Sequence, residues 1–71
     1  MSGYYLKNKD KGLYLKSIDT QNETIEFTDK QSEAKMYSGG EWFATTEKEF
    51  AEFHFPQEKD VLEHMCCVYE D

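Results

Sequence analysis

The stretch YYLKNKDKGLYLKSI, residues 4–18, decides the fold, because it predicts an antiparallel β-hairpin. Tyrosine, leucine and isoleucine, which favour strands, occupy both of its arms. The polar segment NKDKG, residues 8–12, lies between the arms and supplies turn residues, with Gly12 suited to the left-handed position of a bulged loop.

The alternation of side chains along the hairpin predicts its buried face. Tyr4 and Leu6 share one face with Asn8, because successive strand residues point to opposite sides. We expect Leu6, Leu13 and Leu15 to point inward and the lysine-bearing positions to face solvent.

A third strand is predicted after a polar loop at residues 19–23. In TIEFT, residues 24–28, Ile25 and Phe27 alternate with threonine and glutamate. This pattern is typical of a half-buried strand.

The next segment, KQSEAKMY at residues 30–37, predicts a short helix. Gln31 lies three residues after Thr28, which is the spacing of a capping box, and Asp29 is a second candidate N-cap. The glycine pair at residues 39–40 would end this helix or begin the next turn.

A second helix is predicted over EKEFAEFHF, residues 47–55. Thr46 and Glu49 have the spacing of another capping box, and Pro56 stops the helix. An apolar stripe at i, i+3 and i+4 spacing runs along this helix, and most of its charged residues lie outside the stripe. Two further aromatic residues could act as hydrophobic staples at the start of the helix. The stripe is Phe50, Phe53 and His54, and the staples are Trp42 and Phe43.

The last element is predicted as a strand over residues 62–69, since HMCCVYE is rich in strand formers. A helix capped by Asp60 and Glu63 is the alternative. Together the elements predict one α+β domain over residues 1–71, with a small antiparallel sheet covered by two short helices. The N-terminal hairpin, the third strand and the C-terminal strand would form the sheet.

The net charge of −7 is concentrated in one half of the chain. Residues 1–40 hold six acidic residues and six lysines, which cancel, whereas residues 41–71 hold nine acidic residues and two lysines. All eight cations are lysines, so no arginine can clamp a phosphate with two hydrogen bonds. This balance disfavours direct binding to nucleic acid and to anionic membrane surfaces.

Thiol and imidazole chemistry receives little support from the sequence. Cys66 and Cys67 are adjacent, so they do not readily bridge each other, and reduced thiols indicate the cytoplasm. His54 and His64 lack the paired ligand spacing of zinc sites, and no motif surrounds a nucleophile. We therefore expect no enzyme activity, no catalytic residues, no metal and no cofactor. A small thiol or zinc enzyme remains an alternative to the two binding functions considered next.

The acidic second half admits a plain interpretation and a functional one. Net negative charge keeps a small domain soluble. The functional interpretation, our leading hypothesis from the sequence, is DNA mimicry: carboxylates at the density of DNA phosphates would attract the lysine- and arginine-rich groove of a DNA-binding protein and block its nucleic-acid site. The residues predicted to form this partner-binding patch are Glu41, Glu47, Glu49, Glu52, Glu58, Asp60 and Glu63.

The other alternative is an interaction module that binds its target through apolar surface, with acidity serving solubility alone. It would depend on aromatic side chains rather than on carboxylates, and it would be compatible with a homodimer. The aromatic residues in question are Trp42, Phe43, Phe53 and Phe55.

The order of three motifs resembles small acidic host-takeover and accessory proteins of phages of Gram-positive bacteria. The motifs are the lysine-bearing hairpin at residues 4–18, IEFTDKQSEAKMYS at residues 25–38 and TEKEFAEF at residues 46–53, followed by a terminal strand. One acidic protein of this kind is the DNA-mimicking inhibitor of the nucleoid protein HU from a lytic Bacillus phage. The resemblance implies a non-enzymatic binding protein in the cytoplasm of the infected host, with a basic, HU-like DNA-binding protein as partner.

Overall fold

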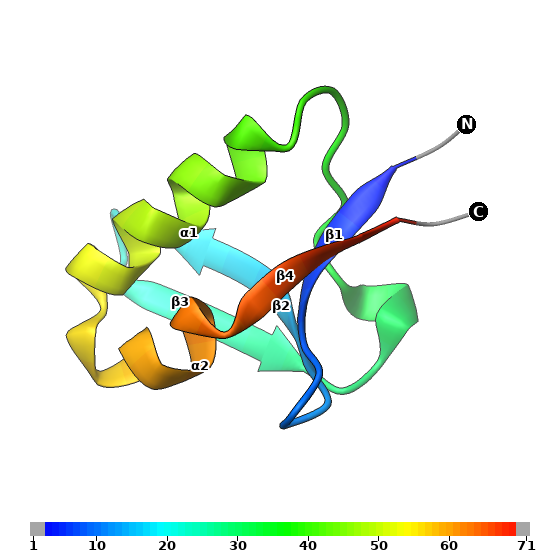
Figure 1. Cartoon of the computed structure of the whole chain (residues 1–71). Coiled ribbons are helices and arrows are strands. Elements are labelled where there is room, and N and C mark those ends of the chain that lie inside the picture. Colours follow the sequence, from blue (N-terminus) through cyan, green and yellow to red (C-terminus); the bar gives the residue numbers. More distant parts are fainter. Residues whose placement is uncertain (1–2, 70–71) are drawn as a thin grey trace.

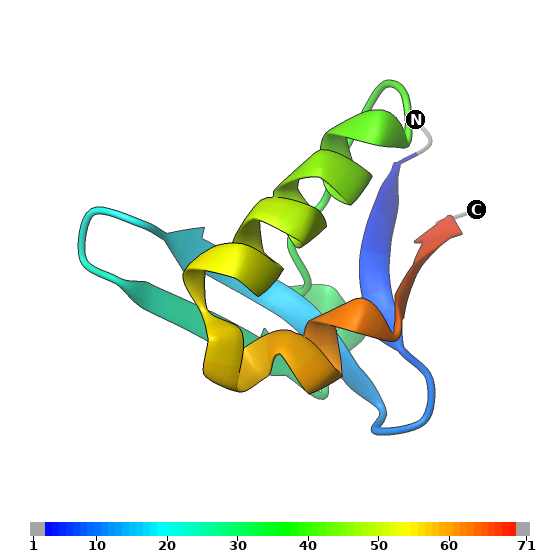
Figure 2. The same ribbon diagram turned by 60° about the vertical axis from the view of Figure 1, so that its left-hand side comes forward.

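In the computed structural model, which describes residues 3–69, four strands form one antiparallel sheet in the order β3–β2–β1–β4 (Figure 1). Two α-helices lie on one face of this sheet (Figure 2). The predicted fold class, an α+β domain with a small antiparallel sheet and two short helices, is confirmed. The strands are β1 (Tyr4–Asn8), β2 (Leu13–Asp19), β3 (Thr24–Thr28) and β4 (Met65–Tyr69), and the helices are α1 (Trp42–His54) and α2 (Lys59–Glu63). None of the helices in the described part of the chain is long and apolar enough to cross a membrane.

The predicted hairpin is present, and its turn has the expected geometry. Gly12 adopts a φ of 67°, and its amide donates to the carbonyl of Asn8 at 2.8 Å. Leu6 and Leu15 are buried as predicted, whereas Leu13 is only half-buried. The lysines of the hairpin are exposed or half-buried, in line with an outward position.

β1 and β2 separate soon after the turn, and the chain after β3 fills the opening between them. β1 pairs with β4 along its whole length, but with β2 only at Lys7↔Tyr14 and Asn8↔Leu13. The amide of Lys35 donates to the carbonyl of Leu15 at 2.9 Å. Two backbone hydrogen bonds, of 3.1 and 2.7 Å, join Tyr4 and Tyr37. These bonds satisfy backbone groups that the separation of the strands would otherwise leave unpaired.

These bonds explain why the helix predicted at residues 30–37 is wrong. Only a short 3₁₀ turn, η1 (Gln31–Glu33), forms there, and Ala34 is already extended. The predicted capping box is absent, although the Thr28 hydroxyl accepts from the Lys30 amide at 3.1 Å. Local helix propensity is outweighed here, because an extended backbone bonds to two strands at once.

α1 begins five residues before the predicted start, and alanines rather than the aromatic stripe face the sheet. Thr46 lies inside the helix, so the second predicted capping box does not form. Ala44 and Ala51, two turns apart, are the helix residues that are fully buried against the sheet. Phe50 is about half exposed, and Phe53 is 85% exposed. The predicted aromatic stripe is therefore the outer side of α1, and the alanines are its inner side.

The sheet face beneath α1 explains this rotation. Tyr4, Leu6 and Leu15 already fill it, and Tyr37 stacks on Tyr4 with ring centroids 5.6 Å apart. Because protein interiors are close-packed, a helix lying over such large side chains can present only small ones. On the opposite face of the sheet a smaller cluster contains Tyr5, Tyr14 and Ala34.

The C-terminal segment combines the two alternatives that its sequence offers. α2 covers Lys59–Glu63, and β4 begins at Met65, so the predicted strand is confirmed for 65–69 and wrong for 62–64. Leu62 is fully buried in the core from its place on α2. The side chain of Asn8, which is only 1% exposed, donates from Nδ2 to the carbonyl of Val61 at 3.0 Å and accepts from the Lys11 amide at 3.1 Å. The Asn8 side chain therefore links α2 to the hairpin turn.

The rotation of α1 makes two substitutions diagnostic. Replacing Ala51 with Leu forces a larger side chain against the sheet and should lower the free energy of unfolding by about 1–3 kcal/mol. Replacing Phe53 with Ala removes an exposed ring and should change it by less than about 0.5 kcal/mol. Urea denaturation of both variants measures the difference. If Phe53→Ala costs several kcal/mol and Ala51→Leu costs little, the helix faces the other way.

Candidate protein-binding surface

The outer side of α1 carries four exposed aromatic rings, which we call the aromatic face: Trp42, Phe43, Phe50 and Phe53. Trp42 is 63% exposed and stacks on Phe43 with ring centroids 4.1 Å apart. Phe50 stacks on His54 at 5.6 Å. The spacing of these residues along the helix places the rings on one side, in two groups about two turns apart.

A hollow lined by carboxylates and a lysine adjoins one flank of the aromatic face. It has a volume of about 420 Å³ and lies between the end of α1 and the start of α2. The side chain of Glu52 is held there by Lys48, whose Nζ lies 2.8 Å from its carboxylate. Both side chains are largely covered, so the pair is less screened by solvent than an open surface pair. The residues that line this hollow are Glu49, Glu52, Phe53, Pro56 and Lys59.

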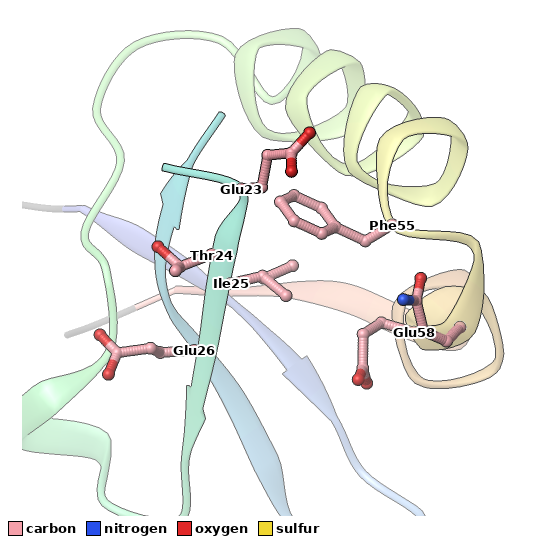
Figure 3. Close-up of a pocket in the computed structure, with 7 residues that line it drawn as sticks. Glu23, Thr24, Ile25, Glu26, Phe55 and Glu58 are labelled. Atoms are coloured by element: carbon pink, nitrogen blue, oxygen red, sulfur yellow. The ribbon is translucent and has the colours of Figure 1, made fainter. Parts of the chain in front are cut away.

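A second hollow, of about 530 Å³, lies on the other side of α1, between β3 and the segment after the helix (Figure 3). Ile25 and Phe55 face each other across it, and Glu23 and Glu58 lie on the same side of β3 as Phe55. Thr24 and Glu26 point toward the opposite face of the strand. Gln57 completes the lining, so no lysine among residues 3–69 lines this hollow.

The seven carboxylates of the predicted patch are distributed over several elements. Glu49 and Glu52 lie together beside Phe53, and Glu58 joins Glu23 and Glu26 at the second hollow. Asp60 and Glu63 are exposed on α2, and Glu41 precedes α1. Glu70 and Asp71, which contribute to the charge surplus, lie outside the described residues.

Glu47 turns toward the body of the protein. Its carboxylate lies 2.7 Å from the Nζ of Lys35 and accepts a hydrogen bond from the hydroxyl of Tyr37. Burial and this hydrogen bond raise the pKa of Tyr37 far above its usual range, so the phenol stays neutral. Glu47 therefore contributes to the attachment of α1 to the extended segment after η1.

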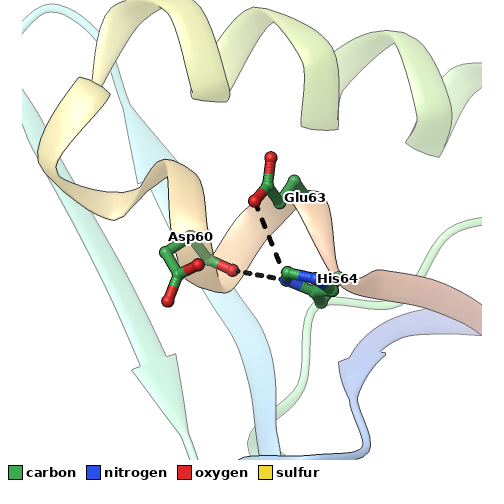
Figure 4. Close-up of side chains that lie close together, drawn as sticks. All are labelled: Asp60, Glu63 and His64. Atoms are coloured by element: carbon green, nitrogen blue, oxygen red, sulfur yellow. Dashed lines mark hydrogen bonds and ion pairs between the residues drawn. The ribbon is translucent and has the colours of Figure 1, made fainter.

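Asp60, Glu63 and His64 form a small exposed cluster on α2 (Figure 4). Each offers one potential metal-ligating atom, and these atoms lie within 4.8 Å of one another. The Nδ1 atom of His64 lies 2.9 Å from the carbonyl oxygen of Asp60 and 3.9 Å from the Glu63 carboxylate. The hydrogen bond to Asp60 raises the pKa of His64, although partial desolvation opposes it, and Glu63 adds to the rise. Cys66 and Cys67 are outside this cluster and are not joined in a disulfide.

The sequence interpretation missed two features that shape this surface: the first-half carboxylates at the second hollow and the alanine side of α1. The first-half residues Glu23 and Glu26 reach the second hollow only because β3 is an edge strand beside the segment at residues 55–58. The inner side of α1 had a signal, since Ala44 and Ala51 are seven residues apart in a segment whose other apolar residues are large. Phe55, assigned to the apolar surface in the sequence analysis, is in fact buried.

In comparisons with protein-family models, with curated proteins and with solved structures, nothing matched this chain.

The contact between Glu41 and Tyr69 can be tested by titration. The Tyr69 hydroxyl donates to the Glu41 carboxylate, and this bond raises the pKa of Tyr69 to about 12. The ionised phenolate would lose the bond and be repelled, so Glu41→Gln should lower this pKa toward the usual value of about 10.

Ring-labelled tyrosine NMR between pH 9 and about 12.5 measures the shift. Glu49→Gln, which has the same charge change on the outer flank of α1, should leave the Tyr69 pKa in place. An unchanged pKa in Glu41→Gln would show that the contact is not formed in solution.

Proposed function

We propose that this protein is a non-enzymatic binding protein that inserts the aromatic face of α1 into an apolar groove of a partner protein. The observation that best supports this proposal is the 85% exposure of Phe53, together with three other exposed rings on the same side of α1. Soluble monomers seldom expose several large apolar side chains on one side of an element unless they are used for binding.

The arrangement of the rings fits recognition of a helix by a groove. Such recognition uses apolar side chains that recur along one side of a helix, with large aromatic residues as anchors. Trp42 and Phe43 lie at the start of α1, and Phe50 and Phe53 lie two turns later. The stacking of Trp42 on Phe43 limits the freedom of both rings, which lowers the entropy lost on binding.

The charges beside the aromatic face specify the edge of the partner's groove. Glu49 and Glu52 lie on one flank, and Glu23 and Glu58 lie at the hollow on the other side of α1. A groove lined by apolar residues and rimmed by lysine or arginine is therefore complementary. With a net charge of −7, association with such a partner should be fast and should slow as salt is added.

DNA mimicry is the second candidate function. In it, the carboxylates occupy the nucleic-acid site of a basic host DNA-binding protein similar to HU. The observation in its favour is that Glu49, Glu58 and Asp60 form no ion pair with any residue in the range 3–69. We place the protein in the cytoplasm for either function, because both of its cysteines are free thiols and the cytoplasm keeps thiols reduced.

Two matched variants separate the two functions. Phe50→Ser combined with Phe53→Ser removes half of the aromatic face, and Glu58→Gln combined with Asp60→Asn removes two unpaired carboxylates. Each variant is used as bait in bacterial lysate beside the wild-type chain, and the captured partner is then purified and titrated. Circular dichroism checks that both variants remain folded.

The proposed function predicts that the aromatic variant weakens binding at least about thirtyfold, which corresponds to one hot-spot residue or more. The charge variant should weaken binding only a few-fold and mainly reduce its salt dependence. Binding retained by the aromatic variant and lost by the charge variant would contradict groove binding and support DNA mimicry.

DNA mimicry has its own direct assay, the displacement of DNA from purified HU. An excess of the wild-type chain at low salt should release the DNA if mimicry is correct, and the charge variant should release less. Retention of DNA under these conditions would exclude HU as the partner.

A further inference from the structure

The outer edge of β3 is a second surface with unsatisfied bonding capacity. In the described residues β3 lies at one end of the sheet and pairs only with β2. A strand in this position leaves the N–H and C=O groups of alternate residues unpaired on its outer side. Its pairs with β2 from Asp19↔Thr24 to Ser17↔Glu26 are regular, so the outer edge is regular over the same residues.

The hollow of about 530 Å³ runs beside this edge rather than elsewhere on the sheet. Its floor is apolar, because Ile25 on β3 faces Phe55 after α1 (Figure 3). Glu23 lies next to the start of β3, and Glu58 lies across the hollow in η2 (Pro56–Glu58). Unpaired backbone groups, an apolar floor and carboxylates at two sides thus occur together.

We propose that β3 accepts an extended, lysine- or arginine-bearing segment of a partner protein as a fifth strand. Backbone hydrogen bonds to β3 would provide affinity, as in other cases of strand addition, and pockets for alternate side chains would provide selectivity. An apolar side chain of the segment would cover Ile25 and Phe55, and basic side chains before or after it would reach Glu23 and Glu58. Side chains two residues apart in a strand point to the same side and are separated by about 6.5 Å. One apolar side chain and the basic side chains two residues before and after it can therefore all face the hollow.

Charge selects a basic segment in preference to a second copy of this chain. Pairing β3 with the β3 of another copy would bring Glu23 and Glu26 near the same residues of that copy. Like charges placed opposite each other across a strand pair are destabilising. A segment with cations meets carboxylates on both sides of the strand, because Glu26 projects from the side opposite Glu23 and Glu58.

The experiment uses the heptapeptide Thr-Lys-Thr-Val-Thr-Lys-Thr, blocked at both ends, as the probe, because its valine and both lysines lie on one side of an extended strand. It is titrated at low salt into the ¹⁵N-labelled full chain. We expect chemical-shift changes centred on the amides of Thr24–Thr28, slower hydrogen exchange along that strand, and weaker binding as salt is added. The same peptide with glutamate in place of both lysines should not bind.

Matched variants locate the contacts. Glu58→Gln should weaken peptide binding about two- to fivefold, the effect expected from losing one exposed ion pair. Asp10→Asn has the same charge change in the β1–β2 turn and should leave affinity unchanged. Phe53→Ala should also leave it unchanged, which separates this site from the groove-binding function proposed for α1.

Three results would overturn the proposal. One is the absence of β3 shifts with the peptide at millimolar concentration. Another is equal weakening by Glu58→Gln and Asp10→Asn, which would indicate attraction by net charge alone. The third is binding of spermine, a polyamine without a peptide backbone, with the same affinity and the same protection of β3, since strand addition requires backbone partners.

Discussion

The contact of Ala44 and Ala51 with the sheet sets the rotation of α1, and this rotation determines what the protein presents to solvent. Both alanines are fully buried over a sheet face already filled by tyrosine and leucine side chains. The large rings of the helix are consequently directed outward. The exposed aromatic face follows from the packing of the core, and the core does not need these rings for its own closure.

The extended segment after η1 connects the two strands and the helix that enclose this core. It bonds to β1 through Tyr37 and to β2 through Lys35, at the point where these strands diverge. Lys35 and Tyr37 then engage Glu47 on α1. One short stretch of chain thereby satisfies strand backbones and anchors the helix, and it removes one of the predicted carboxylates from the outer surface.

Patterns that depend on neighbouring residues were predictable from the sequence. The hairpin, the third strand and the C-terminal strand follow from alternation and turn residues, and the structure confirms them. The helix predicted at residues 30–37 failed because its backbone is needed between two strands, which only the three-dimensional fold reveals. The side of α1 that faces the sheet was not predicted, because the interpretation followed the large apolar residues and gave no weight to Ala44 and Ala51.

The candidate surface was predictable in its composition and not in its arrangement. Charge counting located the surplus in the second half of the chain, but it could not show that Glu47 pairs with Lys35 or that Glu23 joins Glu58 beside β3. Those relations depend on strand order and on the path of the chain after α1. The surface that results combines exposed aromatic rings with hollows in which carboxylates outnumber lysines.

Trp42 is the only tryptophan of the chain and lies on the aromatic face, so it reports directly on the central claim. The measurement is acrylamide quenching of its fluorescence in the free protein at low concentration, compared with a free tryptophan derivative. We predict a quenching constant at least half that of the free derivative, with emission at a long wavelength typical of a hydrated indole. Strong shielding from acrylamide together with blue-shifted emission would show that the aromatic side of α1 is buried, and the proposed binding surface would not exist.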